Sequence, residues 1–195
     1  MTPTNPTKDI GAPAVYVLDA GAGTFTAQAF ATGVLSSFGH NPTFAIRRFT
    51  GEATFASEAP ENASVRVVVQ SGSLELTDQV SDKDRREIEG TMRSEVLDVS
   101  RFPEIVFEAS NPAFAKAGGH EFSASISGKL TLHGATQPQQ ITARVSVTGN
   151  ELHANGEFIV HQSSYGIKRV SVAAGALKIK DDVKVTFDIV ARKKE

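Results

Sequence analysis

Cysteine is absent from this 195-residue chain, and neither sign of charge is in marked excess, since 20 Lys and Arg stand against 22 Asp and Glu. The missing cysteines exclude a disulfide framework, a thiolate nucleophile and every Cys-ligated zinc or iron–sulfur site. The near balance of charge leaves no basic field that could attract nucleic acid. The core must therefore be stabilised by packing alone, and nucleic acid is not expected as a partner.

Long hydrophobic runs are missing as well. No stretch reaches the roughly 18 consecutive apolar residues of a membrane-spanning helix, so no membrane span is predicted. Residues 1–13 contain three prolines and lack the apolar segment after a basic start that marks a signal peptide. We expect a disordered leader over residues 1–13, a single domain over 14–195, and a cytoplasmic location.

What the chain does contain is apolar residues at every second position. The clearest example is 122–132, where Phe122, Ala124, Ile126, Leu130 and Leu132 fall on one face. The same alternation marks 141–147 and 183–189. Segments rich in Val, Phe and Thr and bounded by turn residues predict further strands over 23–31, 44–55, 65–76, 105–110 and 151–160.

One segment departs from this pattern. Ser81 is followed three residues later by Asp84, as in a capping box, and Asp82 and Asp84 place negative charge where a helix N-terminus favours it. This predicts one short helix over 82–92, with Ile88 and Met92 on the same face. We expect the helix to cover one end of the strand assembly.

About eight strands joined by frequent turns fit either a sandwich or a closed barrel. The predicted inner faces mix Gly, Ala and Thr with Phe and Leu, which favours an interior that side chains do not fill completely. A barrel of about eight strands leaves a lumen wide enough for side chains or for one slender ligand. The fold class predicted is therefore all-β, an extended antiparallel barrel.

Two segments in the same order resemble the paired signature of the YceI family of lipocalin-like polyisoprenoid-binding proteins. They are SRFPEIVFEAS at 100–110 and GKLTLHGATQP at 128–138, and further likeness at YVLD (16–19), FTG (49–51), SSYGI (163–167) and DVKVTF (182–187) extends it over about 15–190. The resemblance implies a lipocalin-like barrel whose apolar tunnel holds an isoprenoid chain, with no cofactor and no established catalysis. Relatives in the family are often exported.

The signature residues have a physical interpretation of their own. Pro103 cannot donate to a sheet ladder and so belongs at the first residue of a strand, which leaves Ile105 and Phe107 facing inward. Leu130 and Leu132 also face inward, and a turn at 136–138 is expected to reverse the chain. The same geometry fits an ordinary filled core equally well. The ligand-binding residues predicted are Phe38, His40, Phe44, Phe107, Leu130, Leu132, Phe158, Gln162 and Tyr165.

The chain departs from the family at one place. Where the family commonly has an Arg and an acidic residue around a Ser, this sequence has Gln162 and Ser164 around Ser163. Loss of that ion pair disfavours a charged head group, whereas Gln162, Ser163 and the Tyr165 hydroxyl suit a neutral lipid or quinone. The function predicted is non-catalytic binding or carriage of an isoprenoid or other long-chain lipid, by a monomer or a homodimer.

Two other functions stay open. His40, His133 and His161 could meet at one barrel mouth and bind a metal ion or haem, although no pair of histidines has the spacing of a zinc motif. Alternatively, the barrel could be a stress-related interaction module with a filled core. A hydrolase is disfavoured because Ser36, His40 and Asp19 are not accompanied by a Gly-x-Ser-x-Gly elbow.

Overall fold

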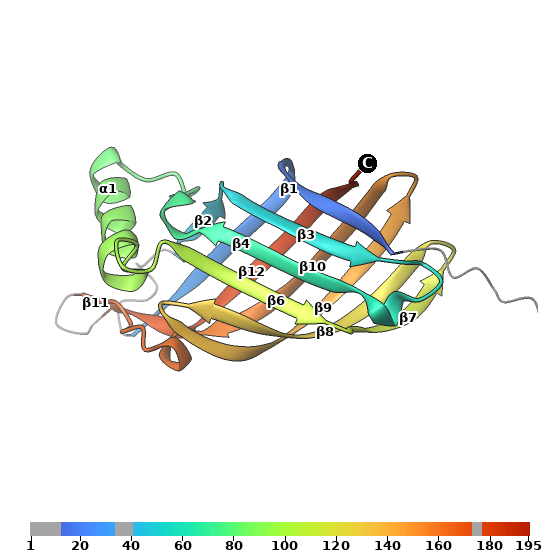
Figure 1. The fold of residues 1–195 in the computed structure, drawn as a ribbon. Coiled ribbons are helices and arrows are strands. Elements are labelled where there is room, and N and C mark those ends of the chain that lie inside the picture. Colours follow the sequence, from blue (N-terminus) through green and yellow to red (C-terminus); the bar gives the residue numbers. More distant parts are fainter. Residues whose placement is uncertain (1–12, 34–40, 173–176) are drawn as a thin grey trace, which may run out of the picture.

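The chain folds into a closed, elongated antiparallel β-barrel with a helix at one end (Figure 1). The computed structural model describes residues 13–33, 41–172 and 177–195. Within these ranges eight strands follow one another around the barrel in the order β1, β3, β4, β6, β8, β9, β10 and β12, and β12 pairs with β1 to close it. The predicted barrel is thereby confirmed.

The strands vary widely in length. The barrel strands are β1 (Ala14–Thr32), β3 (Phe49–Phe55), β4 (Ser64–Gln70), β6 (Glu104–Ser110), β8 (Glu121–Leu132), β9 (Ala135–Thr148), β10 (Glu151–His161) and β12 (Leu177–Lys193). Four shorter strands extend the sheet, namely β2 (Thr43–Ile46), β5 (Leu74–Leu76), β7 (Ala113–Gly118) and β11 (Ser171–Val172).

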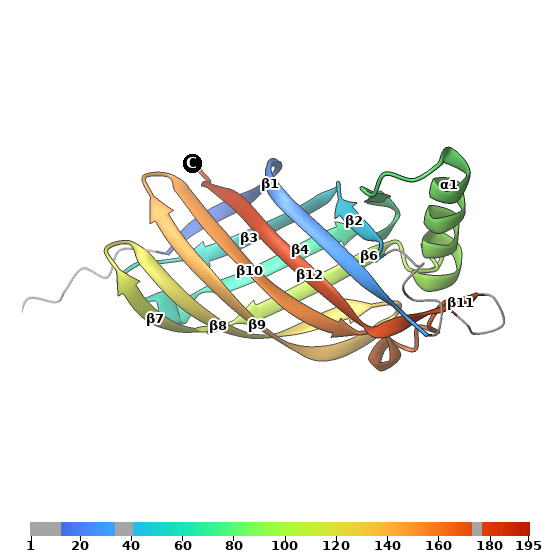
Figure 2. The same ribbon diagram turned by 180° about the vertical axis from the view of Figure 1, so that it is seen from behind.

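The closing pair, β1 and β12, determines the length of the molecule. β1 has 19 residues and β12 has 17, and they pair from Tyr16 opposite Lys193 to Thr32 opposite Lys178. At about 3.3 Å per residue, such strands span on the order of 60 Å. Figure 2 shows β12 lying between β1 and β10 along this wall. The barrel is therefore long enough to enclose an extended interior.

Most predicted strands are present, but two of them are interrupted. Segment 44–55 is divided into β2 and β3 at Arg47 and Arg48, and segment 65–76 is divided into β4 and β5 by a 3₁₀ turn, η3 (Ser71–Ser73). Each interruption lets the chain bend at the helix end, so that β2 pairs with β5 beyond the point where β4 pairs with β6. Period-two alternation continues through such bends and does not reveal them.

The turn predicted at 136–138 is wrong. The chain reverses at His133 and Gly134, which both have positive φ (50° and 76°), as a two-residue type I′ hairpin requires. Leu132 therefore pairs with Ala135, and Pro138 lies inside β9 opposite Lys129. β10 pairs with β9 only as far as Thr142. Pro138 lies beyond this paired part, so its lack of an N–H removes no hydrogen bond between β9 and β10.

The helix begins where the sequence predicts it. α1 spans Asp82–Thr91, and the Ser81 hydroxyl accepts a hydrogen bond from the Asp84 backbone N–H. The helix then continues into a π-helical turn, η4 (Met92–Val96), which the sequence did not indicate. No helix in the described part of the chain is long and apolar enough to cross a membrane.

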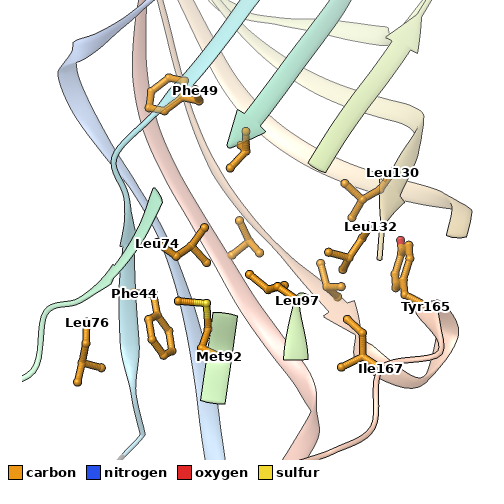
Figure 3. Packing of buried hydrophobic residues seen from close by; sticks show 13 residues of the cluster. Phe44, Phe49, Leu74, Leu76, Met92, Leu97, Leu130, Leu132, Tyr165 and Ile167 are labelled. Atoms are coloured by element: carbon orange, nitrogen blue, oxygen red, sulfur yellow. The ribbon is translucent and has the colours of Figure 1, made fainter. Parts of the chain in front are cut away.

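Buried apolar side chains form two clusters along the barrel. The first lies at the helix end and includes Phe44, Leu74, Met92 and Leu132, which point toward one another from different elements in Figure 3. The second gathers Phe55, Phe122 and Ala143 with neighbours from the other strands. Two further 3₁₀ turns in the described part of the chain are η2 (Pro60–Asn62), which touches β7, and η5 (Gln162–Tyr165), which follows β10.

Candidate functional site: an apolar cavity closed at one end

The barrel encloses a cavity of about 700 Å³. Its wall is formed by alternate residues of the strands, such as Val65, Val67 and Val69 of β4 and Ile105 and Phe107 of β6. Alternate side chains of a strand point to the same face, so one apolar face of each strand lines the interior. The volume falls within the range of about 300–1,000 Å³ typical of small-molecule sites. The interior is not filled, which contradicts the filled-core alternative.

A glycine on the inner face makes room for an aromatic ring of the cavity wall. A Cβ atom at Gly128 would lie 2.5 Å from ring carbons of Phe107 on the neighbouring strand. Glycine at this position therefore leaves room for the ring beside the β8 backbone. Phe107 itself lines the cavity.

The end of the barrel away from the helix is closed by aromatic rings. Phe55 lies 5.5 Å from both Phe114 and Phe122, ring centre to ring centre, and Phe114 lies 6.0 Å from Phe122. All three pairs are edge-to-face, the arrangement that aromatic quadrupoles favour. None of these three residues is among those that line the cavity. The described residues therefore form a cavity that stops at this cluster.

The helix end has a different character. Ile88 and Thr91 of α1, Met92 and Val96 of η4, and then Leu97 border the cavity. The π-helical turn adds a residue to the turn, which allows Met92, Val96 and Leu97 all to approach the interior. The expected position of the helix over one end of the barrel is therefore found.

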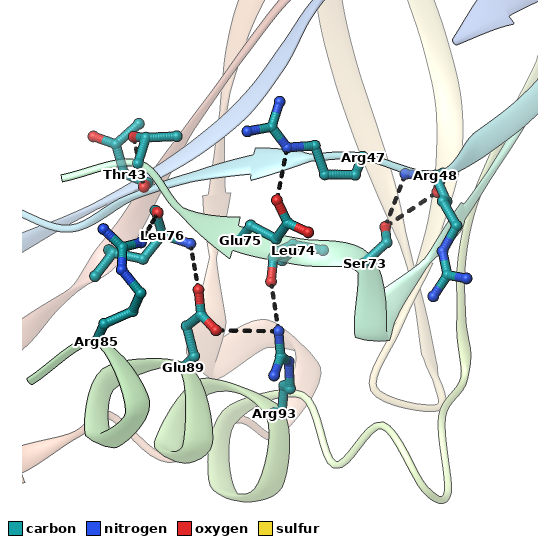
Figure 4. A network of polar contacts seen from close by, with 11 residues as sticks. Thr43, Arg47, Arg48, Ser73, Leu74, Glu75, Leu76, Arg85, Glu89 and Arg93 are labelled. Carbon is teal, nitrogen blue, oxygen red and sulfur yellow. Dashed lines mark hydrogen bonds and ion pairs between the residues drawn. The ribbon is translucent and has the colours of Figure 1, made fainter. Parts of the chain in front are cut away.

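Polar side chains attach this helix to the exposed edge of β5 (Figure 4). Glu89 accepts a hydrogen bond from the Leu76 N–H at 3.0 Å and forms an ion pair with Arg93 at 3.2 Å. Arg93 also donates to the Leu74 carbonyl at 3.5 Å, and Arg85 donates to the Leu76 carbonyl. Helix side chains thus occupy the place of a missing neighbour strand and satisfy the backbone groups of a sheet edge.

Polar residues of the cavity wall are concentrated at the helix end. Of the described lining residues, the polar ones are Asp84, Glu87, Thr91, Gln162 and Lys178. Only Gln162 is buried, with 5% of its surface exposed. Its Nε2 donates to the Lys180 carbonyl at 2.9 Å, which links η5 to β12. The remaining wall is apolar.

The structure places most of the predicted ligand-binding residues around this cavity. Six border it, namely Phe44, Phe107, Leu130, Leu132, Phe158 and Gln162. Tyr165 is buried in the core beside the cavity and does not line it. Burial raises the pKa of its hydroxyl. Phe38 and His40 lie outside the described residues, and ligand binding by any of the nine stays a prediction.

Several lining residues were missed from the sequence. Phe25, Ala27 and Ala29 of β1 alternate in the sequence and could have been found by their period. Met92, Val96 and Leu97 could not, because their approach depends on the π-helical turn and on the contacts of α1 with β5. The local sequence indicates neither the π-helical turn nor the contacts between α1 and β5.

Of the three histidines predicted to meet at one mouth, His40 lies outside the described residues, and His133 and His161 have different partners. His133 lies 3.3 Å from the Tyr165 carbonyl through Nδ1 and packs on the Phe102 ring, while His161 pairs with Asp182 at 2.8 Å. In the described part of the chain, His161, Asp181 and Asp182 have potential metal-ligand atoms within 4.8 Å of one another. These groups already satisfy one another or Ser163, as in an ordinary exposed ion-pair cluster.

Asp181 stabilises the turn that holds Gln162. It accepts hydrogen bonds from the Ser163 hydroxyl at 2.6 Å and from the Ser163 N–H at 2.8 Å. These bonds, above all that of the hydroxyl, hold the pKa of Asp181 below its usual range, and the charges of Arg169 and His161 add to the effect. Asp181 is therefore ionised at neutral pH and fixes η5 against β12.

Comparison with known proteins identifies relatives over most of the chain. The model of the YceI-like domain family matches residues 16–191. Protein YceI of Salmonella arizonae is 28% identical over 145 residues, which are 74% of this chain and 63% of that protein. A UPF0312 protein of Pseudomonas paraeruginosa is 32% identical over 103 residues, 53% of this chain and 48% of that protein. The matched regions thus span about half to under two thirds of these relatives.

Solved structures share the fold. Burkholderia cenocepacia BcnA superposes with a TM-score of 0.68 at 18% identity, covering 89% of this chain and 98% of that one. A polyisoprenoid binding domain from Saccharophagus degradans superposes with a TM-score of 0.67 at 14% identity, covering 93% and 99%. At these identities the likeness establishes the fold alone.

Proposed function

The chain belongs to the YceI-like domain family, and from that membership together with its apolar cavity we propose that it binds a long-chain isoprenoid or similar neutral lipid without catalysing a reaction. The observation on which the proposal mainly rests is the cavity of about 700 Å³, lined by apolar side chains and closed by aromatic rings. A polyisoprenoid binding domain with the same fold supports the choice of ligand class.

The hydrophobic effect supplies the binding energy in this proposal. Each buried methylene contributes about 0.8 kcal/mol, so a chain of a few tens of carbons gains far more than its ordering costs. A flexible linear hydrocarbon fits an elongated lumen because it can extend between the strands. The ligand would be carried, stored or shielded from water, and its polar end would remain near the helix.

Organic extraction followed by mass spectrometry tests the proposal directly. The protein is expressed in a host that makes isoprenoids, purified without detergent and extracted with chloroform and methanol. We expect a prenyl chain or similar long lipid at close to one molecule per protein. The same extraction on a variant with a narrowed lumen, Ala154→Phe, serves as the control and should yield less lipid. Repeated recovery of no lipid from the unmodified protein would overturn the proposal.

A further inference from the structure

Gln162 has one half of its amide engaged and the other half free. The Nε2 group donates to the carbonyls of Lys180 and Asp181 at 2.9 and 3.5 Å, which establishes which amide atom faces β12. The amide oxygen accepts no hydrogen bond from the described residues, yet it is not among the fully enclosed atoms that lack a partner. Gln162 lines the cavity, and its incompletely enclosed amide oxygen is the polar atom of this side chain that has a free acceptor position.

When a bound hydrocarbon chain excludes water from the cavity, an amide oxygen left unpaired in its wall is costly, and a ligand group that donates a hydrogen bond removes this cost. A glutamine carbonyl can only accept. A hydroxyl or N–H of the ligand satisfies it, whereas an ether or ketone oxygen, which has no proton to donate, would be repelled. Gln162 therefore distinguishes donors from acceptors among neutral head groups.

Charges at the same end bear on anionic head groups. Asp84 and Glu87 of α1 border the cavity together with Lys178 of β12, so the rim has two acidic groups and one basic group. All three are exposed, and their attraction or repulsion is weakened by water. The rim therefore offers a phosphate no cluster of cations.

We infer that Gln162 selects ligands whose polar end is a hydroxyl, such as a prenol or a quinol, over quinones, ethers and prenyl phosphates. This inference rests on the proposed function and specifies the chemical class that the cavity accepts. The ligand would lie with its hydrocarbon chain along the lumen and its hydroxyl hydrogen-bonded to the Gln162 amide oxygen. Gln162 is thus a specificity-determining residue.

The test compares three probes with one hydrocarbon chain, namely a prenol, its methyl ether and its phosphate monoester. Affinity is measured by displacement of an apolar fluorescent dye, which the absence of tryptophan from the chain makes simple. We expect the prenol to bind about tenfold more tightly than the ether, the effect of one neutral hydrogen bond. The phosphate should bind no better than the ether.

Two variants isolate the side chain. Gln162→Met should abolish the preference, so that the prenol loses affinity and the prenol and the ether bind equally. Gln137→Met is the matched control, because Gln137 Nε2 donates to the Ser164 carbonyl of the same turn, but from outside the cavity. It should keep the preference for prenol.

The outcomes separate the two proposals. If the unmodified protein binds prenol and ether equally, or binds the phosphate most tightly, the inference about Gln162 is overturned while lipid binding stands. If none of the three probes binds, the proposed function fails and the inference with it. The comparison within the unmodified protein decides the question even if Gln162→Met does not fold.

Discussion

The two ends of the barrel contain similar apolar residues but differ in how densely those residues are packed. At the far end, Phe55, Phe114 and Phe122 pack edge-to-face and fill the lumen. At the helix end, Phe44 and Met92 border an open cavity, and polar side chains connect α1 to β5. One end contributes stability through dense packing, while the other leaves space and polar groups for a ligand. The number of aromatic residues at an end therefore does not show whether they fill the lumen or line a cavity.

The largest effect should come from truncating matching rings at the two ends. Phe122→Ala removes a ring surrounded by other rings and should lower the free energy of unfolding by about 3–5 kcal/mol. Phe44→Ala should cost about half as much, because part of its ring faces the cavity and has fewer partner atoms. Urea denaturation of the lipid-free protein measures both. Equal losses would mean that the helix end is packed as densely as the far end.

A bulky side chain placed in the lumen should weaken lipid binding, because it takes up the space that distinguishes the cavity from the packed end. Ala154 of β10 borders the cavity, and Ala154→Phe would displace roughly four methylenes of a bound chain. At about 0.8 kcal/mol each, affinity should fall by about 3 kcal/mol, roughly a hundredfold. Ile159→Phe, on the outer face of the same strand and 41% exposed, is the control and should leave affinity unchanged. Equal affinities of the two variants in dye displacement would argue that lipid binds elsewhere.

Releasing the helix from β5 should affect only the helix end. Glu89→Ala leaves the Leu76 N–H and Arg93 without their shared acceptor, which should ease local opening by about 1–2 kcal/mol. Hydrogen exchange of the Leu76 amide should accelerate by roughly tenfold, and bound lipid should leave faster. Glu95→Ala, an exposed change on the adjoining turn, should do neither. Unaltered exchange at Leu76 would show that packing alone holds the helix.

Lowering the pH should promote local opening at the helix end before it does so at the far end. This is the smallest of the effects expected here. The pKa of Asp181 is lowered in the folded state, so its contribution is present above its unfolded value of about 3.9 and is lost as the pH falls through the lower folded value. Protection of the backbone amides around η5, measured relative to the intrinsic exchange rate at each pH, should therefore be weaker at about pH 3 than at pH 6. Asp181→Asn should show this loosening at both pH values. Simultaneous opening at the aromatic cluster would contradict the comparison.

The features that could be predicted from the sequence are those that depend on residues close together in the chain. Alternation is a property of each strand, so the inward positions of Phe107, Leu130 and Leu132 could be read directly. The Ser81 cap was equally local and marked the start of α1. The hairpin turn was misassigned because Pro138 was taken as a turn residue, whereas the positive φ angles of His133 and Gly134 make the reversal.

The candidate site was predicted less completely. Tyr165 was expected to contribute its hydroxyl to the mouth, yet it packs in the core, because η5 turns Gln162 toward the lumen and Tyr165 beside it. The amide geometry of Gln162 depends on carbonyls of β12, which are adjacent only after β10 and β12 have paired. Sequence spacing contains no information about that contact.

By itself, the sequence determined most of the strands, the helix start and the apolar character of the inner face, because each depends on the order of neighbouring residues. Only the tertiary structure decided that the lumen is open, that one end is closed by Phe55, Phe114 and Phe122, and that Gln162 faces inside. These features depend on contacts between strands distant in the chain. Such contacts arise from barrel closure, in which the pairing of β1 with β12 sets what every inward side chain meets.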